Sequence, residues 1–408
     1  MRNVAIVGFG QSVHTTRRRD VNMAELVYEA VKAVFDETNL TPKDIDASVT
    51  GSMPLFEGID LPEFWCGDQW GIFQKPILRI TTGGTTGGSV AQGAYYAVAS
   101  GLYDTVIAIA FQKQSDGDTM IGLAGSVFAD LASMLNYGME TEAIMSLTGG
   151  GATAIAVFQA SSYMYRSGCT IEHFDKVSAL CRNNAAKNPY AHIKQPGITP
   201  EDVAKTPMVT YPLRFGHICP ASDGACAMIF TTEEKARKMC DRPAWVKGCA
   251  SGSDECTPIG LFGSGVYVDP AEQRACKLAA KKAYKLAGIS NPEKEIDVVE
   301  IYQPFASQQL LFFERLFLCK EGKAPKALDD GVMEIDGDLP TDPSGGVLCT
   351  NAIGSTAMER VGECALQIMG KAGKHQVPKD VHNAIAHGWG GILNLTSVTV
   401  LGDTPRKR

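Results

Sequence analysis

The sequence predicts an α/β fold built from two similar halves. Short β-branched runs alternate with helical stretches, beginning with a strand in "NVAIVG", a helix in "MAELVYEAVKAVFDET" and a strand in "IDASVTGS". From about Arg242 the same order starts again with "PAWVKGCAS", "PAEQRACKLAAKKAYKLAG" and "IDVVEIYQ". The repetition indicates an internal duplication. The continuously apolar strands predict parallel sheets that are covered on both faces.

Each half also contains a helix that follows a turn of small residues. In the first half, "TTGGTTGG" leads a helix expected over residues 84–99, and in the second, "NAIGSTAMERVGECALQIMG" spans residues 351–370. Glycines before a helix allow close approach of backbone N–H groups to a ligand, and a helix N-terminus attracts negative charge. We expect these two helices to start near one another on a pseudo-two-fold axis.

The predicted boundaries place a subdomain inside the first half. Residues 1–111 with 221–240 form the N-terminal half, and residues 241–408 form the C-terminal half. The stretch between them, residues 112–220, mixes helical and polar segments and is too long for a loop. It is therefore predicted to be an inserted subdomain.

Composition excludes several classes of function. The 408 residues carry a formal net charge of -7, which argues against a nucleic-acid partner. No apolar run approaches the roughly 18 residues of a membrane span, so we expect a cytoplasmic protein without membrane attachment. The twelve cysteines and seven histidines lack the spacing of structural zinc sites, which predicts reduced thiols and no metal in this chain. "GFGQSV" lacks the third glycine of a dinucleotide fingerprint, which argues against a nicotinamide or flavin site.

Several segments resemble the thiolase superfamily, in the branch of the sterol-carrier-protein and archaeal types. They are "FQKQS", "RNNAAKNPYA", "CPASDGACA" and "PSGGVLCTNAIGST", and the resemblance covers essentially the whole chain. It implies two βαβαβαββ halves in a five-layered α/β/α/β/α body, with an inserted loop subdomain. It also implies chemistry at a carbon–carbon bond next to a CoA thioester, with coenzyme A as co-substrate.

The departures from the family pattern fall on its reactive residues. Where thiolases carry a nucleophilic cysteine, this chain has Gly84 in "GTTGG". The family's Asn or His before Ala-Phe is Tyr302 in "YQPFA", and the Gly-His-Pro histidine falls on Asn351, or on Ala352 if the alignment slips by one residue. The C-terminal element is similar to "HGWGG", which begins at His387.

The remaining groups still suit enolate chemistry. Backbone N–H groups of Gly84 and of Gly390 or Gly391 are predicted to form an oxyanion hole. The Tyr302 hydroxyl and the Asn351 amide are predicted to hold the thioester oxygen, with a core aromatic and a helix N-cap as the structural alternatives.

His387 has an ordinary pKa suited to proton transfer near neutral pH, although a structural histidine remains the alternative. Two routes would replace the missing nucleophile. Cys349, two residues before Asn351, is the best candidate by sequence, whereas Cys219 is interpreted as structural. In the other route the CoA thiolate attacks the ketone directly.

Three functions follow from these residues and the resemblance. The first is a thiolase-type acyltransferase that cleaves a 3-oxoacyl-CoA, such as the bulky aromatic benzoylsuccinyl-CoA, with CoA. The second is a retro-aldolase acting on a 3-hydroxyacyl-CoA, and the third is a non-catalytic subunit that binds acyl-CoA. The resemblance also implies a homodimer formed through the strand before the Gly84 helix, with a small partner that contains a zinc ribbon and an OB-like fold.

Overall fold

In a computed structural model of the chain, residues 1–117, 151–254, 269–391 and 394–406 are described. The strands of these residues form a nine-stranded sheet in the order β3-β2-β4-β7-β1-β8-β11-β10-β9 and a two-stranded hairpin. The strands are β1 (Val4–Gln11), β2 (Ala47–Gly51), β3 (Ile77–Arg79), β4 (Thr105–Lys113), β5 (Met208–Thr210), β6 (Leu213–Arg214), β7 (Asp223–Thr232), β8 (Ala244–Ser253), β9 (Val298–Glu300), β10 (Asn383–Gly390) and β11 (Leu395–Gly402).

The sheet order shows the duplication. Read outward from the centre, β1, β7, β4 and β2 in the first half correspond to β8, β11, β10 and β9 in the second. The pairing agrees at each step, with two antiparallel contacts followed by one parallel contact in both halves. The two halves join through two residue pairs, Ala5 with Trp245 and Ile6 with Ala244.

The expectation of parallel sheets was wrong, because the sheet is mixed. Each half has antiparallel strands at its centre and parallel pairs only toward its outer edge. The strands are nonetheless buried along their length, since helices cover both faces, and a continuously apolar run does not distinguish the two directions.

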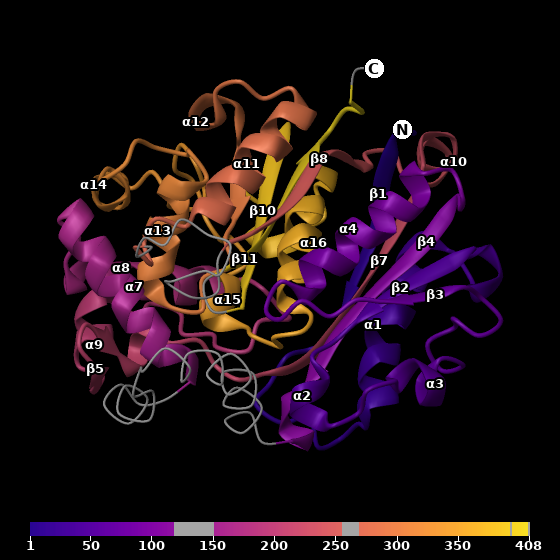
Figure 1. The fold of residues 1–408 in the computed structure, drawn as a ribbon, viewed down its shortest axis with the longest axis horizontal. Helices are drawn as coiled ribbons and strands as arrows, with labels where there is room; N and C mark the ends of the chain where they lie inside the picture. The colour runs from indigo at the N-terminus through magenta and orange to yellow at the C-terminus, as the bar shows by residue number, and fades with distance from the viewer. Residues whose placement is uncertain (118–150, 255–268, 392–393, 407–408) are drawn as a thin grey trace.

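The helices form layers around this sheet (Figure 1). They are α1 (Met23–Thr38), α2 (Pro54–Glu57), α3 (Pro62–Cys66), α4 (Thr86–Ala99), α7 (Gly151–Ser167), α8 (Ile171–Ala185), α9 (Pro200–Ala204), α10 (Glu233–Met239), α11 (Arg274–Ala287), α12 (Pro292–Glu295), α13 (Ala306–Arg315), α14 (Ala324–Asp329), α15 (Gly346–Cys349) and α16 (Thr356–Met369). Three buried apolar clusters separate the layers: one under α1, one around α4 and α16, and one that joins α11 and α13 to α7 and α8. This arrangement is the α/β architecture that the sequence predicts.

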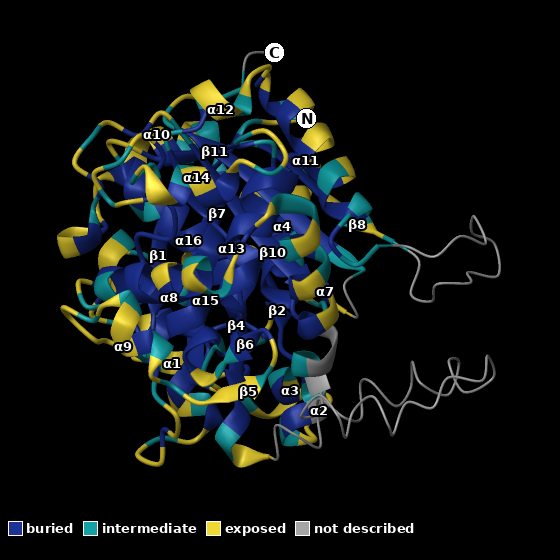
Figure 2. Ribbon diagram, turned by 90° about the vertical axis from the view of Figure 1, so that its left-hand side faces the viewer, coloured by how far each residue is buried: buried dark blue, intermediate teal, exposed yellow. Residues whose placement is uncertain are grey.

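The two glycine-led helices meet at the centre of the molecule, as predicted. A Cβ added at Gly87 of α4 would lie 2.5 Å from the backbone nitrogen of Met358 and 2.6 Å from the carbonyl oxygen of Ser355, at the start of α16. Both helices are buried along most of their length (Figure 2). Glycine is therefore needed at residue 87 because the backbones of the two helices touch there. The sequence analysis expected instead that these glycines let a ligand approach the backbone.

The first glycines of the chain also serve packing. Gly8 and Gly10 lie within β1, and a Cβ on Gly10 would lie 2.2 Å from the carbonyl oxygen of Ala30 in α1. Helix α1 begins after Asn22, which forms a capping box with Glu25. The strand therefore runs directly under its helix, and "GFGQSV" is not a phosphate-binding turn.

The predicted inserted subdomain packs against the second half. Its helices α7 and α8 pack on α13 of the second half, while residues 118–150 lie outside the described residues. The boundaries 1–111 with 221–240, 112–220 and 241–408 stay predictions. No helix among the described residues is long and apolar enough to cross a membrane.

Candidate active site

The turn before α4 is held by its threonine side chains. Thr85 donates from its hydroxyl to the carbonyl oxygen of Thr82 at 2.5 Å, and Thr86 donates to that of Gly83 at 2.6 Å. Gly83 has a φ of 62°, a left-handed conformation that favours glycine. These hydrogen bonds fix the turn, which brings Gly84 against Trp389 and Gly390 of the second half.

Gly84, Tyr302 and Gly390 come together, as the sequence analysis expected for one site. A Cβ added at Gly84 would lie 2.5 Å from the carbonyl oxygen of Trp389, 3.2 Å from the Tyr302 hydroxyl oxygen and 3.3 Å from the Cα of Gly390. A Cβ at Gly390 would in turn lie 2.6 Å from the backbone nitrogen of Gly84 and 2.7 Å from that of Thr85. The Tyr302 hydroxyl therefore lies beside the space that a nucleophilic side chain at residue 84 would need.

Tyr302 follows β9 and is only 2% exposed. Burial raises the pKa of its phenol, and the neighbouring Cys219 adds to the increase. Tyr302 is therefore neutral and able to donate a hydrogen bond. No hydrogen bond joins its hydroxyl to another side chain or backbone group within the described ranges.

Asn351 is fixed by contacts at both its backbone and its amide. Its backbone nitrogen donates to the Ser222 hydroxyl at 3.1 Å, and its carbonyl oxygen accepts from the Gln114 side chain at 2.7 Å. Its Oδ1 accepts from the Thr356 hydroxyl at 3.3 Å, which turns Nδ2 toward the sulfur of Cys219, 3.2 Å away.

The alternative of Asn351 as a helix cap was wrong, because the N-cap of α16 is Ser355. Ala352 is the other residue that could align with the family's histidine. Its side chain has no polar atom, and its backbone carbonyl accepts hydrogen bonds from the N–H groups of Ser355 and Thr356.

Cys219, which the sequence analysis interprets as structural, lies beside Asn351. It belongs to the predicted insert, and its backbone nitrogen donates to the carbonyl oxygen of Pro304 at 2.9 Å, next to the Tyr302 segment. The thiol is half-buried, and burial raises its pKa to about 12 although the hydrogen bond from Asn351 opposes the increase. Its place beside the "SDGA" turn was the only sequence signal, and it did not reveal the distant Asn351 as a partner.

Cys349 lies in different surroundings although it is close to Asn351 in sequence. Its side chain is fully buried at the end of α15, near the charges of Arg182 and Asp342. Burial raises the pKa of its thiol to about 12. A thiol without exposed surface does not fit the accessible thiolate that a nucleophile requires.

His387 is also buried, on β10 two residues before Trp389. Its Nε2 lies 3.1 Å from the Thr396 hydroxyl and 3.8 Å from the sulfur of Cys276, and its ring packs on Phe312 with centroids 4.3 Å apart. The Thr396 hydroxyl donates to the carbonyl of Gly388, so it accepts from Nε2–H. Burial lowers the pKa of His387 to about 3. Its described contacts include no residue of the Gly84, Tyr302 and Asn351 group, which favours the structural alternative over proton shuttling.

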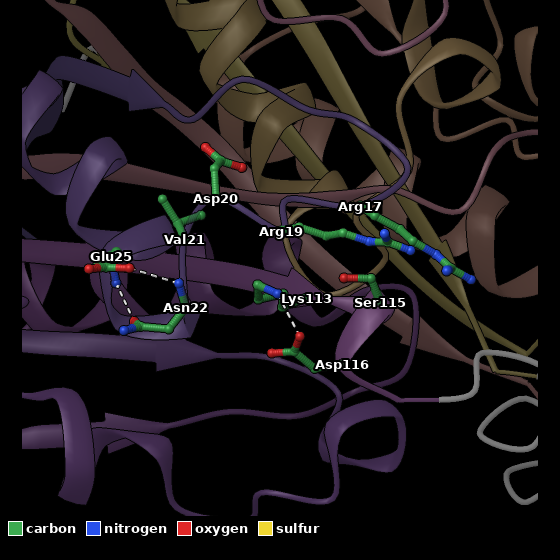
Figure 3. Close-up of a pocket in the computed structure, with 9 residues that line it drawn as sticks. All are labelled: Arg17, Arg19, Asp20, Val21, Asn22, Glu25, Lys113, Ser115 and Asp116. Carbon is green, nitrogen blue, oxygen red and sulfur yellow. Dashed lines mark hydrogen bonds and ion pairs between the residues drawn. The ribbon is translucent and has the colours of Figure 1, made fainter.

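A separate surface cavity of about 630 Å³ lies where β4 ends (Figure 3). It is lined by Arg17, Arg19, Asp20, Val21, Asn22, Glu25, Lys113, Ser115 and Asp116. The charges of its three cationic and three acidic side chains cancel, and Lys113 forms an ion pair with Asp116. None of the predicted site residues lines it. The described residues hold no cluster of His, Cys, Asp and Glu suited to a metal ion.

Comparison with known proteins identifies the family. The family described as "Thiolase C-terminal domain-like" matches residues 267–403. The acetyl-CoA acetyltransferase of Methanothermobacter thermautotrophicus is 30% identical over 403 residues, which cover 98% of this chain and 99% of that protein. The steroid side-chain-cleaving aldolase of Thermomonospora curvata is 29% identical over 408 residues, 98% of this chain and 97% of the aldolase.

A solved structure agrees with these relatives. The structure named "Ltp2-ChsH2(DUF35) aldolase" superposes with a TM-score of 0.79 at 27% identity and covers 98% of both chains. The chain belongs to the thiolase superfamily, in the sterol-carrier-protein branch. Relatives named as an acetyltransferase and as aldolases support an enzyme that acts on acyl-CoA.

Proposed function

We propose that the protein cleaves the bond between the α- and β-carbons of a 3-oxoacyl-CoA, with coenzyme A as co-substrate, into two acyl-CoAs. The observation that carries this proposal is that the Tyr302 hydroxyl lies beside Gly84 and Gly390, while Cys219, which holds the Asn351 amide, is hydrogen-bonded to Pro304 two residues after Tyr302. Neutral donors held in a buried site stabilise a thioester oxygen as it becomes an enolate. The bulky aromatic substrate, such as benzoylsuccinyl-CoA, is part of this proposal and rests on the sequence resemblance.

Direct attack by the CoA thiolate fits this site better than an enzyme-bound acyl group. Gly84 has no room for a side chain, and the Cys349 thiol is fully buried. The protein would then contribute orientation and charge stabilisation.

A second candidate is retro-aldol cleavage of a 3-hydroxyacyl-CoA. It is favoured by the Tyr302 hydroxyl beside the space of the missing nucleophile, because this reaction needs no covalent intermediate. The similarity to two proteins named as aldolases supports it as well.

The stoichiometry of CoA use tests the proposal. The purified protein, with any small partner that copurifies, would be given 3-oxoacyl-CoA and 3-hydroxyacyl-CoA substrates, including benzoylsuccinyl-CoA, and the products identified by mass spectrometry. One CoA consumed for two thioesters formed supports thiolysis. An aldehyde or ketone released without CoA consumption supports the retro-aldolase. Acyl-CoA binding without turnover would contradict both and support a non-catalytic subunit.

We also propose a homodimer that pairs through β3, together with a small partner subunit. β3 is the outer strand of the first half, and Ile77 and Leu78 on it are 43% and 54% exposed. Phe64 and Trp65 on the nearby α3 are 77% and 71% exposed. An apolar edge strand of this kind is a template for pairing with a second copy. The partner named ChsH2(DUF35) in the similar solved structure supports a small subunit here.

A further inference from the structure

Cys219 lies where three distant segments of the chain converge. Ile218 forms a β-bridge with Phe305, and the backbone nitrogen of Cys219 donates to Pro304 at 2.9 Å, so the insert is pinned to the segment that carries Tyr302. The third segment precedes α16 and contributes Asn351. The position of the thiol is thus fixed by backbone contacts.

The Asn351 amide is oriented to stabilise negative charge on that sulfur. Its Oδ1 is occupied by the Thr356 hydroxyl, which leaves Nδ2–H to donate to Cys219 at 3.2 Å. A hydrogen bond donated to sulfur favours the thiolate over the thiol. Gln114 holds the backbone of Asn351 in place, because its side chain donates to the carbonyl oxygens of both Ser222 and Asn351.

Tyr302 indicates independently that a ligand belongs beside this thiol. Its hydroxyl is in a side chain only 2% exposed, and it forms no hydrogen bond with any group of the described chain. A ligand oxygen beside this hydroxyl would supply the hydrogen-bond partner that the described residues do not. Tyr302 lies two residues before Pro304, whose carbonyl oxygen accepts from the backbone nitrogen of Cys219 at 2.9 Å, so the two segments are neighbours.

We infer that Cys219 exchanges a proton with the α-carbon of the bound thioester. This inference rests on the proposed function and adds the group that protonates the enolate. In the cleavage direction the S–H bond breaks, a C–H bond forms at the α-carbon, and the thiolate remains beside Asn351. The thiolate recovers its proton from the CoA thiol in thiolysis, or from the β-hydroxyl group in retro-aldol cleavage.

The acidity of the thiol agrees with this role. Burial raises the pKa of Cys219 to about 12, so the group is protonated at neutral pH and available as a donor. An enolate carbon is the stronger base and takes the proton. Cys349 has the same raised pKa of about 12 but no exposed surface and no hydrogen bond from Asn351, which makes it a matched control.

Deuterium exchange at the α-carbon tests the inference without any bond cleavage. Acetyl-CoA and succinyl-CoA would be incubated in D2O with the wild-type protein and its copurifying partner, and with Cys219→Ala, Cys219→Ser and Cys349→Ala variants. Proton NMR would follow the loss of the α-proton signal. We expect exchange in the wild type and in Cys349→Ala, and a loss of about 100-fold or more in both Cys219 variants. The dissociation constants of the thioesters should stay within a few-fold.

Exchange in the Cys219 variants within threefold of wild type, or no exchange in the wild type, would overturn the inference. The serine variant keeps the test valid if the alanine variant fails to fold. Iodoacetamide labelling adds a second measurement, in which Cys219 reacts before Cys349 and is protected by acetyl-CoA. Exchange without cleavage of any 3-oxoacyl-CoA or 3-hydroxyacyl-CoA would overturn the proposed function and leave this inference standing.

Discussion

The segments that lead into α4 and α16 are equivalent in the duplicated fold, yet they differ in chemistry. The segment before α4 presents Gly84, whose surroundings leave no room for a side chain. The segment before α16 presents Asn351, whose amide is aimed at a thiol from the insert. The comparison teaches that two equivalent segments present different groups, with backbone and close packing before α4 and an amide side chain before α16.

The largest effect is expected from the polar groups of the second half. Tyr302→Phe removes the unpartnered hydroxyl, and Asn351→Ala removes the donor to Cys219, so each should lower kcat about 100-fold or more because an enolate donor is lost. Steady-state kinetics on the substrate found by the CoA assay would measure this. The Cys349→Ala variant is the control, and turnover unchanged in Tyr302→Phe would show that the hydroxyl is not a donor.

A cysteine introduced at residue 84 should not act as a nucleophile. In Gly84→Cys the new Cβ would collide with the carbonyl oxygen of Trp389 at 2.5 Å, so we expect a loss of about 1–3 kcal/mol in the free energy of unfolding. Denaturant unfolding would measure the stability, and mass spectrometry of digested protein would search for an acylated peptide that contains the introduced cysteine. A stable variant that accumulates the acyl-enzyme would contradict the comparison between the two halves.

The contact between the two central helices can be tested within α4 alone. Gly87→Ala should destabilise the protein by about 1–3 kcal/mol, because its Cβ would meet the backbone of Met358 and Ser355. Gly93→Ala is the matched control, since its Cβ would meet the flexible end of Ile80 at 2.7 Å and alanine favours a helix. Equal midpoints in urea for the two variants would count against backbone contact at Gly87.

The outer edges of the two halves also differ. β3 exposes Leu78, whereas β9 is buried and covered by the segment at Thr341. Leu78→Lys should weaken the proposed dimer by a factor of about 10 or more in dissociation constant, because a charge would face the paired edge. Sedimentation velocity would measure it, with Leu278→Lys on the exposed face of α11 as the control. A monomeric wild type would refute the β3 dimer.

The smallest effect concerns the pH dependence of stability at His387. The pKa of His387 is about 3 in the folded protein and about 6.5 in an unfolded chain. As pH falls, the imidazole is therefore protonated in the unfolded chain before it is protonated in the folded one. Stability should therefore decrease between pH 6.5 and 3 by up to about 1.4 kcal/mol per pH unit from this group. His387→Leu should lack this part of the slope in unfolding experiments. Identical slopes would show that the imidazole is not buried in its neutral form.

Much of the fold could be predicted from the sequence because local patterns decide it. The capping box of Asn22 and Glu25 marks the start of α1, which covers the residues predicted. The apolar pattern does not report strand direction. The run "DTVIAIAFQ" forms β4, which pairs in parallel with β2 on one side and antiparallel with β7 on the other.

The candidate site was only partly predictable, for a different reason. The proximity of Gly84, Tyr302 and Gly390 was expected because these residues align with motifs that meet in the active site of the thiolase superfamily. The pairing of Asn351 with Cys219 joins residues 132 positions apart through a tertiary contact, so no local spacing reports it. The proton-transfer role of His387 stays a prediction, and the sequence does not show that its burial next to Phe312 lowers its pKa.

The packing around Gly84 also constrains how this protein can evolve. The nearest obstacle to a side chain at residue 84 is a backbone carbonyl at the end of β10, followed by the hydroxyl of Tyr302. A single codon change that introduced cysteine would therefore place its side chain against the backbone of β10. Any side chain at residue 84 would first need compensating changes in the second half, at the end of β10 and around Tyr302, so two distant parts of the chain must change together.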